Sequence, residues 1–304
     1  MTDRRLADLI TTGTGGQIVI LGFPFDEGVA RNGGREGAKT GPERFRYWLK
    51  RYGTVRNPQW KVDLSGISVS DAGDIPPCQT LEEGHAALTR ATENILAAGG
   101  IPFVVGGGND QSYPNARALL NHLGGRPGGV INVDAHLDVR PLIAGRAHSG
   151  SSFRQLLEDP AFDGGNFIEF ATQGAQCSAE HAEYIQNRKA RILWLDEVQR
   201  HEGAVDSFRN ALGKLTWQCQ SLFVSFDLDS VAACDAPGVS CPGVQGLKAH
   251  DALMIAYFSG LHLLVSLFDL SEYNPAIEDE RTGRLAAAVF YHFCLGFAMR
   301  EKKS

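Results

Sequence analysis

Short apolar runs alternate with longer segments of helical periodicity along most of the chain. The apolar runs are continuous rather than alternating and are rich in β-branched and aromatic residues, which is typical of strands covered on both faces. Seven strands are predicted on this basis, at residues 17–22, 101–105, 129–133, 166–170, 191–195, 221–226 and 261–270.

Seven helices are predicted between these runs, at residues 41–51, 81–98, 113–123, 178–187, 203–212, 247–259 and 281–298. In the second of them, the predicted buried positions are Leu81, Ala86, Leu88, Ala91 and Ile95. Alternating strands and helices predict a mainly parallel sheet with helices on both faces. Because no linker, internal repeat or low-complexity tract interrupts the pattern, we expect a single doubly wound α/β domain over residues 1–304.

Composition narrows the class of protein. The chain has 304 residues, of which 43% are hydrophobic and 21% charged, as in a globular protein with a large core. A net charge of -6 without a basic stripe argues against a nucleic-acid partner. No apolar run reaches the ~18 residues of a membrane span. The six cysteines are scattered without a C-x-x-C pair, which favours a cytoplasmic protein.

Acidic residues cluster directly after two of the predicted strands. Asp134, His136 and Asp138 occupy alternate positions after one apolar run, and Asp227 and Asp229 follow another. Side chains at alternate positions of an extended segment point to the same side. Grouped carboxylates at a buried strand end repel one another unless a cation neutralises them. An oxygen-rich set with one imidazole suits Mn²⁺ better than Zn²⁺, so we predict a metal centre, and a solvated turn is the alternative for the first motif taken alone.

Two further strands end in polar groups. The turn at residues 106–108 leads to Asn109, and Glu272 follows the last predicted strand. In open α/β sheets, sites form at the carboxyl ends of the strands, so four strands would deliver polar groups to one edge. The three glycines lack the lysine of a P-loop and the spacing of a dinucleotide fingerprint, which favours a tight turn.

Several charged residues near the metal motif have two interpretations each. His148, in a Gly/Ser-rich loop, is either a proton shuttle or an exposed loop histidine. Arg140 and Arg154 either pair with a substrate carboxylate, or they balance the charge of the nearby carboxylates or lie on a solvated face. The glycine-rich segment 31–42 either covers a substrate or is an ordinary loop.

One cysteine, Cys241, lies on a loop that we expect to overhang this site, and Cys234 is close to it in sequence. The two residues are either part of a redox-sensitive lid or two unremarkable thiols.

Together these motifs resemble the ureohydrolase family of arginases, agmatinases and formimidoylglutamases. The resemblance spans about residues 22–275 and rests on residues 134–138, 225–229 and 236–238 and on the Glu272 segment. Within the family the chain is most similar to formimidoylglutamases, through residues 26–29, 32–42, 106–108 and 149–155. Arginases usually carry asparagine where this chain has Arg140, and an arginine suits a substrate that ends in carboxylates.

The resemblance implies an arginase-like three-layer fold and two Mn²⁺ ions. One ion would be held by Asp134, His136, Asp227 and Asp229. The other would be held by Asp134, Asp138, Asp227 and a histidine, whose position is occupied by Asn109 in this chain. Because an amide oxygen is a weaker and neutral donor, we expect one firmly bound ion and a second that is weak or absent.

The implied activity is Mn-dependent hydrolysis of N-formimino-L-glutamate to L-glutamate and formamide, a step of histidine degradation. Metal-bound hydroxide would attack the amidine carbon. Asp229 would hold a proton for the departing amine, His148 would relay protons, and Glu272 would hold the formimino nitrogens. Arg140 and Arg154 would bind the glutamate carboxylates.

Two other functions stay open from the sequence. A guanidino-acid hydrolase of arginase or agmatinase type would release urea instead. A catalytically silent ligand-binding homologue is supported only by Asn109. In each case the partner is a small molecule, and the family suggests a homo-oligomer.

Overall fold

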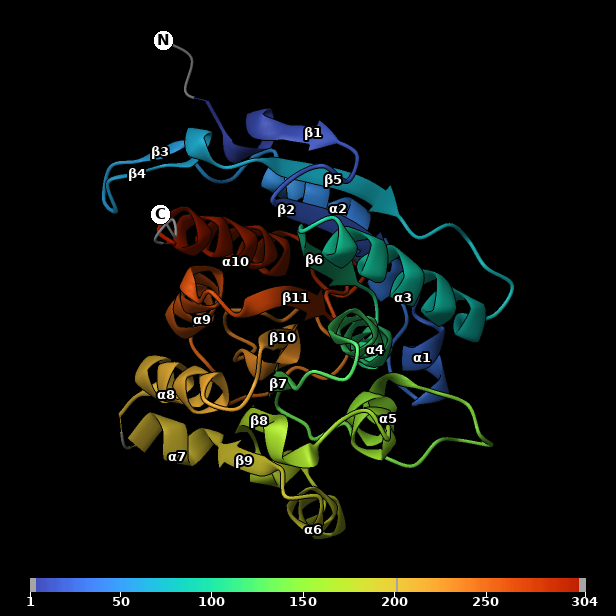
Figure 1. Cartoon of the computed structure of the whole chain (residues 1–304). Coiled ribbons are helices and arrows are strands. Elements are labelled where there is room, and N and C mark those ends of the chain that lie inside the picture. The colour runs from blue at the N-terminus through green and yellow to red at the C-terminus, as the bar shows by residue number, and fades with distance from the viewer. Residues whose placement is uncertain (1–3, 201, 301–304) are drawn as a thin grey trace.

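The computed structural model describes residues 4–200 and 202–300, and a nine-stranded sheet runs through its centre (Figure 1). The strand order is β1-β5-β2-β6-β11-β10-β7-β8-β9, and neighbouring strands pair in parallel throughout. The strands are β1 (Ile10–Thr12), β2 (Ile18–Phe23), β5 (Val69–Asp74), β6 (Ile101–Gly106), β7 (Gly128–Val133), β8 (Phe167–Thr172), β9 (Arg191–Trp194), β10 (Ser221–Asp227) and β11 (Val265–Ser271). A small antiparallel pair, β3 (Arg56–Asn57) and β4 (Val62–Asp63), lies outside this sheet.

Helices cover both faces of the sheet, so the molecule has three layers (Figure 1). One face packs against α2 (Gly41–Leu49), α7 (Leu195–Arg200), α8 (Ala204–Thr216), α9 (Ala249–Leu261) and α10 (Glu280–Ala298). The other packs against α3 (Leu81–Ala97), α4 (Ser112–Leu123), α5 (Ser152–Glu158) and α6 (Ala179–Asn187). The remaining α-helix of the described residues is α1 (Glu27–Arg31), which follows β2. The predicted doubly wound α/β architecture is confirmed.

Residues along the central strands alternate between the two cores. In β10, Phe223 belongs to the core under α4, whereas Leu222 and Val224 belong to the core under α8 and α9. Every residue of β10 is buried, because both faces are covered by helices. This double burial explains why the strand reads as a continuous apolar run.

The sequence pattern located seven strands of the sheet but missed β1 and β5. β5 has the sequence VSDAGD, and its polar residues and glycine leave no apolar run from which a strand could be predicted. The expected strand at 261–270 was wrong at its start, because α9 continues to Leu261 and β11 begins at Val265. Ala86 is exposed instead of buried, since Gly84 and Leu88 face the core.

The short helices α1, α5 and α7 were also missed, because five to seven residues give little helical periodicity. No helix in the described ranges is long and apolar enough to cross a membrane.

Candidate metal centre

Four neighbouring strands at the centre of the sheet carry the predicted ligands. β6, β11, β10 and β7 lie side by side in this order. Asn109 follows β6, Glu272 follows β11, Asp227 ends β10, and Asp134 follows β7. Because all four strands run parallel, these residues meet at one edge, as the strand ends predict.

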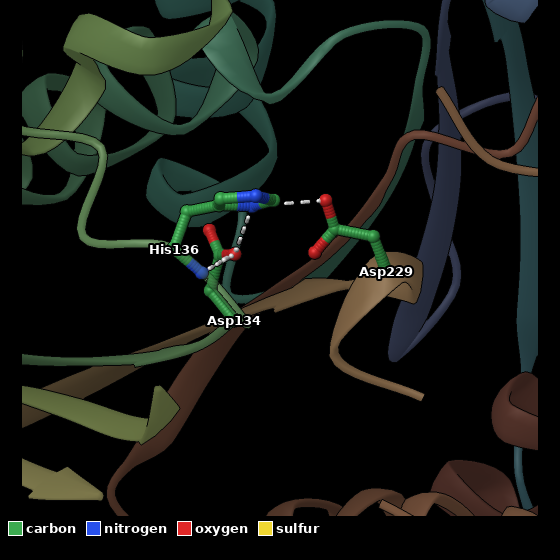
Figure 2. A group of neighbouring side chains, drawn as sticks. All are labelled: Asp134, His136 and Asp229. Atoms are coloured by element: carbon green, nitrogen blue, oxygen red, sulfur yellow. Dashed lines mark hydrogen bonds and ion pairs between the residues drawn. The ribbon is translucent and has the colours of Figure 1, made fainter. Parts of the chain in front are cut away.

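Asp134, His136 and Asp229 form the tightest group of this edge. One ligand atom from each lies within 4.8 Å of the others. His136 Nδ1 is 3.1 Å from Asp229 Oδ2 and 3.4 Å from Asp134 Oδ1, and Figure 2 shows the imidazole between the two carboxylates. Asp134 Oδ1 also accepts a hydrogen bond from the His136 backbone N–H at 2.7 Å, which fixes the short turn after β7.

The other predicted ligands surround this group. Asn109 Nδ2 donates to Asp134 Oδ2 at 3.1 Å and to Asp138 Oδ2 at 2.8 Å. Asp227 Oδ1 accepts from the Asp229 backbone N–H at 2.8 Å, so the turn after β10 is built like the turn after β7. Five carboxyl and amide side chains, together with His136, therefore share one site.

Two site residues have left-handed backbone conformations. Asp138 has a φ of 44° and Glu272 a φ of 64°. Such angles are uncommon for residues other than glycine and cluster at functional sites. In Glu272 the conformation turns Oε1 toward the backbone N–H of Asn109, which donates to it at 3.1 Å, while Oε2 is buried without a partner.

The pKa values of the carboxyl groups in the site indicate that a cation would stabilise their charged forms. Burial, followed by repulsion from Asp229, raises the pKa of Asp134 to about 6. Burial also raises the pKa of Asp138, Asp227 and Glu272 well above the usual range of carboxyl groups. Attraction to Asp229 is the main cause that raises the pKa of His136 above its ordinary value.

A divalent ion fits these residues. Asp229 Oδ1 and Glu272 Oε2 are buried acceptors without a hydrogen-bond partner, and buried polar atoms normally have one. A cation placed among the carboxylates would neutralise their mutual repulsion and satisfy an orphaned oxygen. Carboxylate oxygens with one imidazole suit Mn²⁺.

A row of buried polar residues lies beneath the acidic cluster. Glu169, Asn132, Ser225 and Asp269 are register partners across four adjacent strands. Asn132 Nδ2 donates to Glu169 Oε2 at 2.9 Å and to Asp134 Oδ2 at 3.2 Å. The row thus orients Asp134 from behind, and sequence reasoning missed it because each of its members sits singly inside an apolar run.

His148 is buried and only 1% exposed. Its Nε2 lies 3.0 Å from the carbonyl oxygen of Pro141, and its Nδ1 accepts from the backbone N–H of Gly150 at 3.2 Å. Burial lowers the pKa of His148, which favours the neutral ring. Both ring nitrogens are therefore engaged by backbone groups of the same loop in this structure.

The two candidate arginines have different surroundings. Arg140 lines the cavity at the acidic cluster, and its NH1 donates to Asn32 Oδ1 at 3.2 Å. Arg154 Nε instead pairs with Glu158 Oε1 at 2.7 Å, and its guanidinium lies 4.0 Å from the ring centre of Tyr184. Arg154 is not among the residues that line the cavity.

The cavity has a volume of about 260 Å³ and is lined by both acidic and basic side chains. Of the residues expected at the site, His136, Asp138, Arg140, Asp227, Asp229 and Glu272 line it. The lining also includes four residues that sequence reasoning did not assign to the site, namely Asn32, Arg35, Ser149 and Ser240. The signal for the first two was the glycine-rich segment 31–42, which does reach the site.

Arg35 connects two loops that line the cavity, its own and the loop that carries Ser240. Its Nε and NH2 donate to the carbonyl oxygen of Ser240 at 3.0 and 2.8 Å, and its backbone N–H donates to Ser240 Oγ at 2.8 Å. Cys241 also lines the cavity, and both it and Cys234 are exposed free thiols.

Comparison with known proteins gives one family. A family model described as "Arginase family" matches residues 16–296. The chain is 33% identical over 281 residues to a formimidoylglutamase of Aeromonas hydrophila, covering 90% of this chain and 85% of that protein. It is 32% identical to a formimidoylglutamase of Geobacillus thermodenitrificans, covering 90% and 81%. The crystal structure of Trypanosoma cruzi formiminoglutamase with Mn²⁺₂ matches with a TM-score of 0.94 and 48% identity, over 98% of this chain and 100% of that one.

Proposed function

The chain belongs to the arginase family, and we propose from this membership that it is a manganese-dependent hydrolase of N-formimino-L-glutamate, with L-glutamate and formamide as products. The two curated relatives named above are formimidoylglutamases, and the Trypanosoma cruzi formiminoglutamase structure contains two manganese ions. The reaction belongs to histidine degradation, as the resemblance of the motifs implies.

One observation carries this substrate assignment: carboxylates and arginines line the same cavity. The carboxylates include Asp138, Asp227 and Glu272, and the arginines are Arg35 and Arg140. The substrate has a matching polarity, because its formimino group is cationic and its glutamate carries two carboxylates. A guanidinium can bind a carboxylate through two parallel hydrogen bonds. Agmatine has no carboxylate and would leave these arginines without a partner on the ligand.

The acidic cluster supplies the ligands of two manganese sites. Asp134, His136, Asp227 and Asp229 would hold one ion, and Asp134, Asp138, Asp227 and Asn109 would hold the other, more weakly. When bound, Mn²⁺ lowers the pKa of a coordinated water towards neutrality and stabilises negative charge that develops at the reacting carbon.

The protein's own side chains orient the reaction. In the overall change, a water oxygen joins the amidine carbon, the bond from that carbon to the glutamate nitrogen breaks, and a proton passes to the departing nitrogen. Glu272 Oε2, which has no hydrogen-bond partner among residues 4–200 and 202–300, would accept a hydrogen bond from the formimino nitrogens and hold the carbon in place. Asp229 Oδ1, which also lacks a partner, would carry the proton to the leaving amine.

Two roles expected from the sequence are changed in this proposal. His148 does not relay protons, since Pro141 and Gly150 occupy both of its ring nitrogens. Arg35 replaces Arg154 as the second cation for the substrate, because Arg35 lines the cavity and Arg154 is paired with Glu158. Arg140 keeps the principal role.

We also propose that the protein is cytoplasmic and that it forms a homo-oligomer. All six cysteines are free, which is typical of proteins in a reducing compartment. Trp217 and Leu263 are 92% and 52% exposed, and such apolar side chains are common at contacts between subunits.

A product assay tests the function. N-formimino-L-glutamate, L-arginine and agmatine are each incubated with the protein and Mn²⁺, and formamide, glutamate and urea are quantified. We expect formamide and glutamate in equal amounts from the first substrate, and no urea from the others. Urea from arginine, or no product from any of the three, would refute the proposal.

A further inference from the structure

The end of α1 contacts the loop that carries Arg140. Two consecutive residues make these contacts: Arg31 is the last residue of the helix, and Asn32 is its C-cap. The loop closes on itself through a hydrogen bond from the Arg140 N–H to the Gly150 carbonyl oxygen at 2.9 Å.

Asn32 joins both ends of this loop. Its Oδ1 accepts from Arg140 NH1 at 3.2 Å, and its Nδ2 donates to Ser149 Oγ at 3.1 Å. Gly150 permits the approach, because a Cβ at this position would lie 2.9 Å from Asn32 Nδ2 and 3.1 Å from Arg140 Cδ. Asn32, Arg140 and Ser149 all line the cavity.

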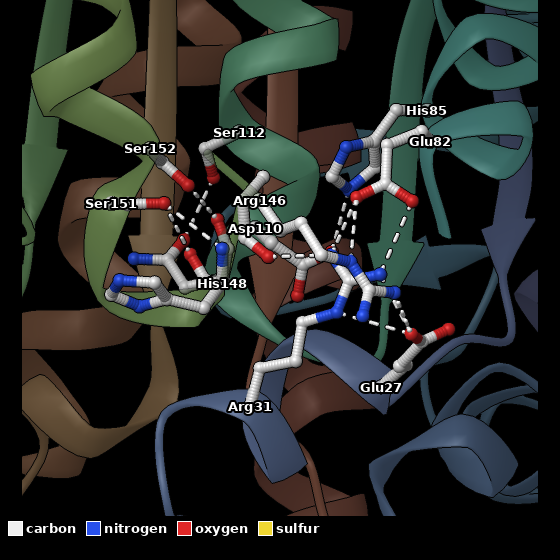
Figure 3. A network of polar contacts seen from close by, with 12 residues as sticks. Glu27, Arg31, Glu82, His85, Asp110, Ser112, Arg146, His148, Ser151 and Ser152 are labelled. Atoms are coloured by element: carbon white, nitrogen blue, oxygen red, sulfur yellow. Dashed lines mark hydrogen bonds and ion pairs between the residues drawn. The ribbon is translucent and has the colours of Figure 1, made fainter. Parts of the chain in front are cut away.

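Arg31 fastens the other side of the loop. Its NH1 donates to the Ala147 carbonyl oxygen at 2.8 Å, and the same guanidinium pairs with Glu27 at 2.7 Å and Glu82 at 2.6 Å. Figure 3 shows Arg31 between these two carboxylates, with Arg146 beside them. The Arg31 side chain is only 10% exposed, whereas Glu27 and Glu82 are 44% and 47% exposed.

We propose that Asn32 is a positioning residue for substrate affinity: it holds the guanidinium of Arg140 on the cavity wall, and Arg31 keeps the loop in place. The proposal rests on the assignment of Arg140 to the substrate carboxylates. Arg140 is exposed, and an unheld arginine would lose rotamer freedom on binding the substrate. Asn32 prevents much of this loss. Being uncharged, it leaves the positive charge of Arg140 available to the substrate.

The variant Asn32→Asp tests the role of Asn32. The carboxylate has the same shape as the amide and can accept from both Arg140 and Ser149, so the fold is expected to persist. Its charge neutralises Arg140 and repels the substrate. We expect KM for N-formimino-L-glutamate to rise about tenfold or more, with kcat changed less than about twofold. The inhibition constant of L-glutamate should rise by a similar factor. Asn94→Asp, on the exposed side of α3, adds the same charge away from the cavity and should change neither constant.

Glutamate binding separates this inference from the proposed function. Calorimetry on the manganese-loaded protein measures it without turnover. If the parent does not bind L-glutamate, both the carboxylate role of Arg140 and the role of Asn32 are refuted. If the parent binds glutamate and Asn32→Asp binds it equally well, only the inference about Asn32 is refuted.

A second pair of variants tests the anchor. In Arg31→Lys, a single ammonium cannot reach Glu27, Glu82 and the Ala147 carbonyl together. We expect KM to rise a few-fold, with manganese content unchanged. Arg146→Gln removes a half-exposed partner of Glu27, and exposed ion pairs contribute little, so its KM should equal that of the parent. A parental KM for Arg31→Lys, or equal increases in both variants, would refute the anchoring role.

Discussion

The side-chain amide nitrogen of Asn109 lies 2.8 Å from Asp138 Oδ2 and donates a hydrogen bond to it. The amide thus turns its nitrogen toward the acidic cluster, and its Oδ1 accepts from the hydroxyls of Ser112 at 2.7 Å and Ser271 at 3.1 Å. As a metal ligand, the amide would present its oxygen to the ion. The two hydroxyls allow this, because a hydroxyl can accept as well as donate.

Replacing Asn109 by histidine should strengthen manganese binding. An imidazole is a stronger donor than an amide oxygen and supplies the ligand that the family resemblance implies. We expect Asn109→His to bind more Mn²⁺ per chain than the parent at limiting metal, as measured by elemental analysis after dialysis against micromolar Mn²⁺. Asn109→Ala serves as the control and should bind less than either. If the histidine variant binds no more manganese than the parent, residue 109 does not contact the second ion.

Removing Asp227 should abolish catalysis. Its carboxylate is expected to contact both ions, so Asp227→Ala should lower kcat/KM at least ~10³-fold. A chelator should have the same effect on the parent, and Mn²⁺ should then restore the parent but not the variant. Circular dichroism verifies that the variant is folded. Full activity in either experiment would contradict the metal mechanism.

Arg140 and Arg154 should respond differently to the same substitution. Arg140→Gln removes a cation from the cavity wall, and loss of a charged hydrogen bond to a carboxylate should raise KM roughly tenfold or more. Arg154→Gln breaks a pair with Glu158 outside the cavity and should leave KM within about twofold of the parent. Steady-state kinetics measure KM for both variants. A larger rise in KM for Arg154→Gln than for Arg140→Gln would assign the substrate carboxylates to Arg154 instead.

Asp269 should make stability depend on pH. Burial raises the pKa of its carboxyl group to about 7. Between its ordinary value and about 7, the folded protein therefore binds more protons than the unfolded chain, so the free energy of unfolding falls as the pH rises through this window. In Asp269→Asn this titrating group is absent. The free energy of unfolding should therefore fall less than in the parent over the same pH window, by up to a few kcal/mol.

Denaturant unfolding at pH 4.5 and pH 7.5, with a chelator present, measures this difference. Asp196→Asn, an exposed substitution on α7, should retain the parental pH dependence. The same loss of stability with pH in Asp269→Asn as in the parent would show that Asp269 is not the titrating group.

The sequence predicted seven strands of the sheet and the acidic cluster at their ends for a physical reason. Strands buried on both faces must be apolar, so acidic residues such as Asp134 and Asp227 are easily recognised where these strands end. The other residues that line the cavity were harder to predict. Asn32 and Ser240 come from loops far apart in the sequence, and only the folded chain brings both into the cavity.

The sequence could not predict which groups surround the side chains of His148 and Arg154. His148 lies in a Gly/Ser-rich loop that reads as exposed, yet its partners are the Pro141 carbonyl and the Gly150 amide, which no residue pattern reveals. The sequence likewise gave no sign that Arg154 stacks on Tyr184, because the two residues lie on different helices.

The most direct test of the central claim is proton NMR of N-formimino-L-glutamate incubated with the protein, first with a chelator and then with excess Mn²⁺. Our account predicts no change under the chelator, followed by loss of the formimino proton signal and equal growth of the formamide and glutamate signals once manganese is added. Conversion at the same rate in the presence of the chelator, or an unchanged spectrum after manganese addition, would contradict the account.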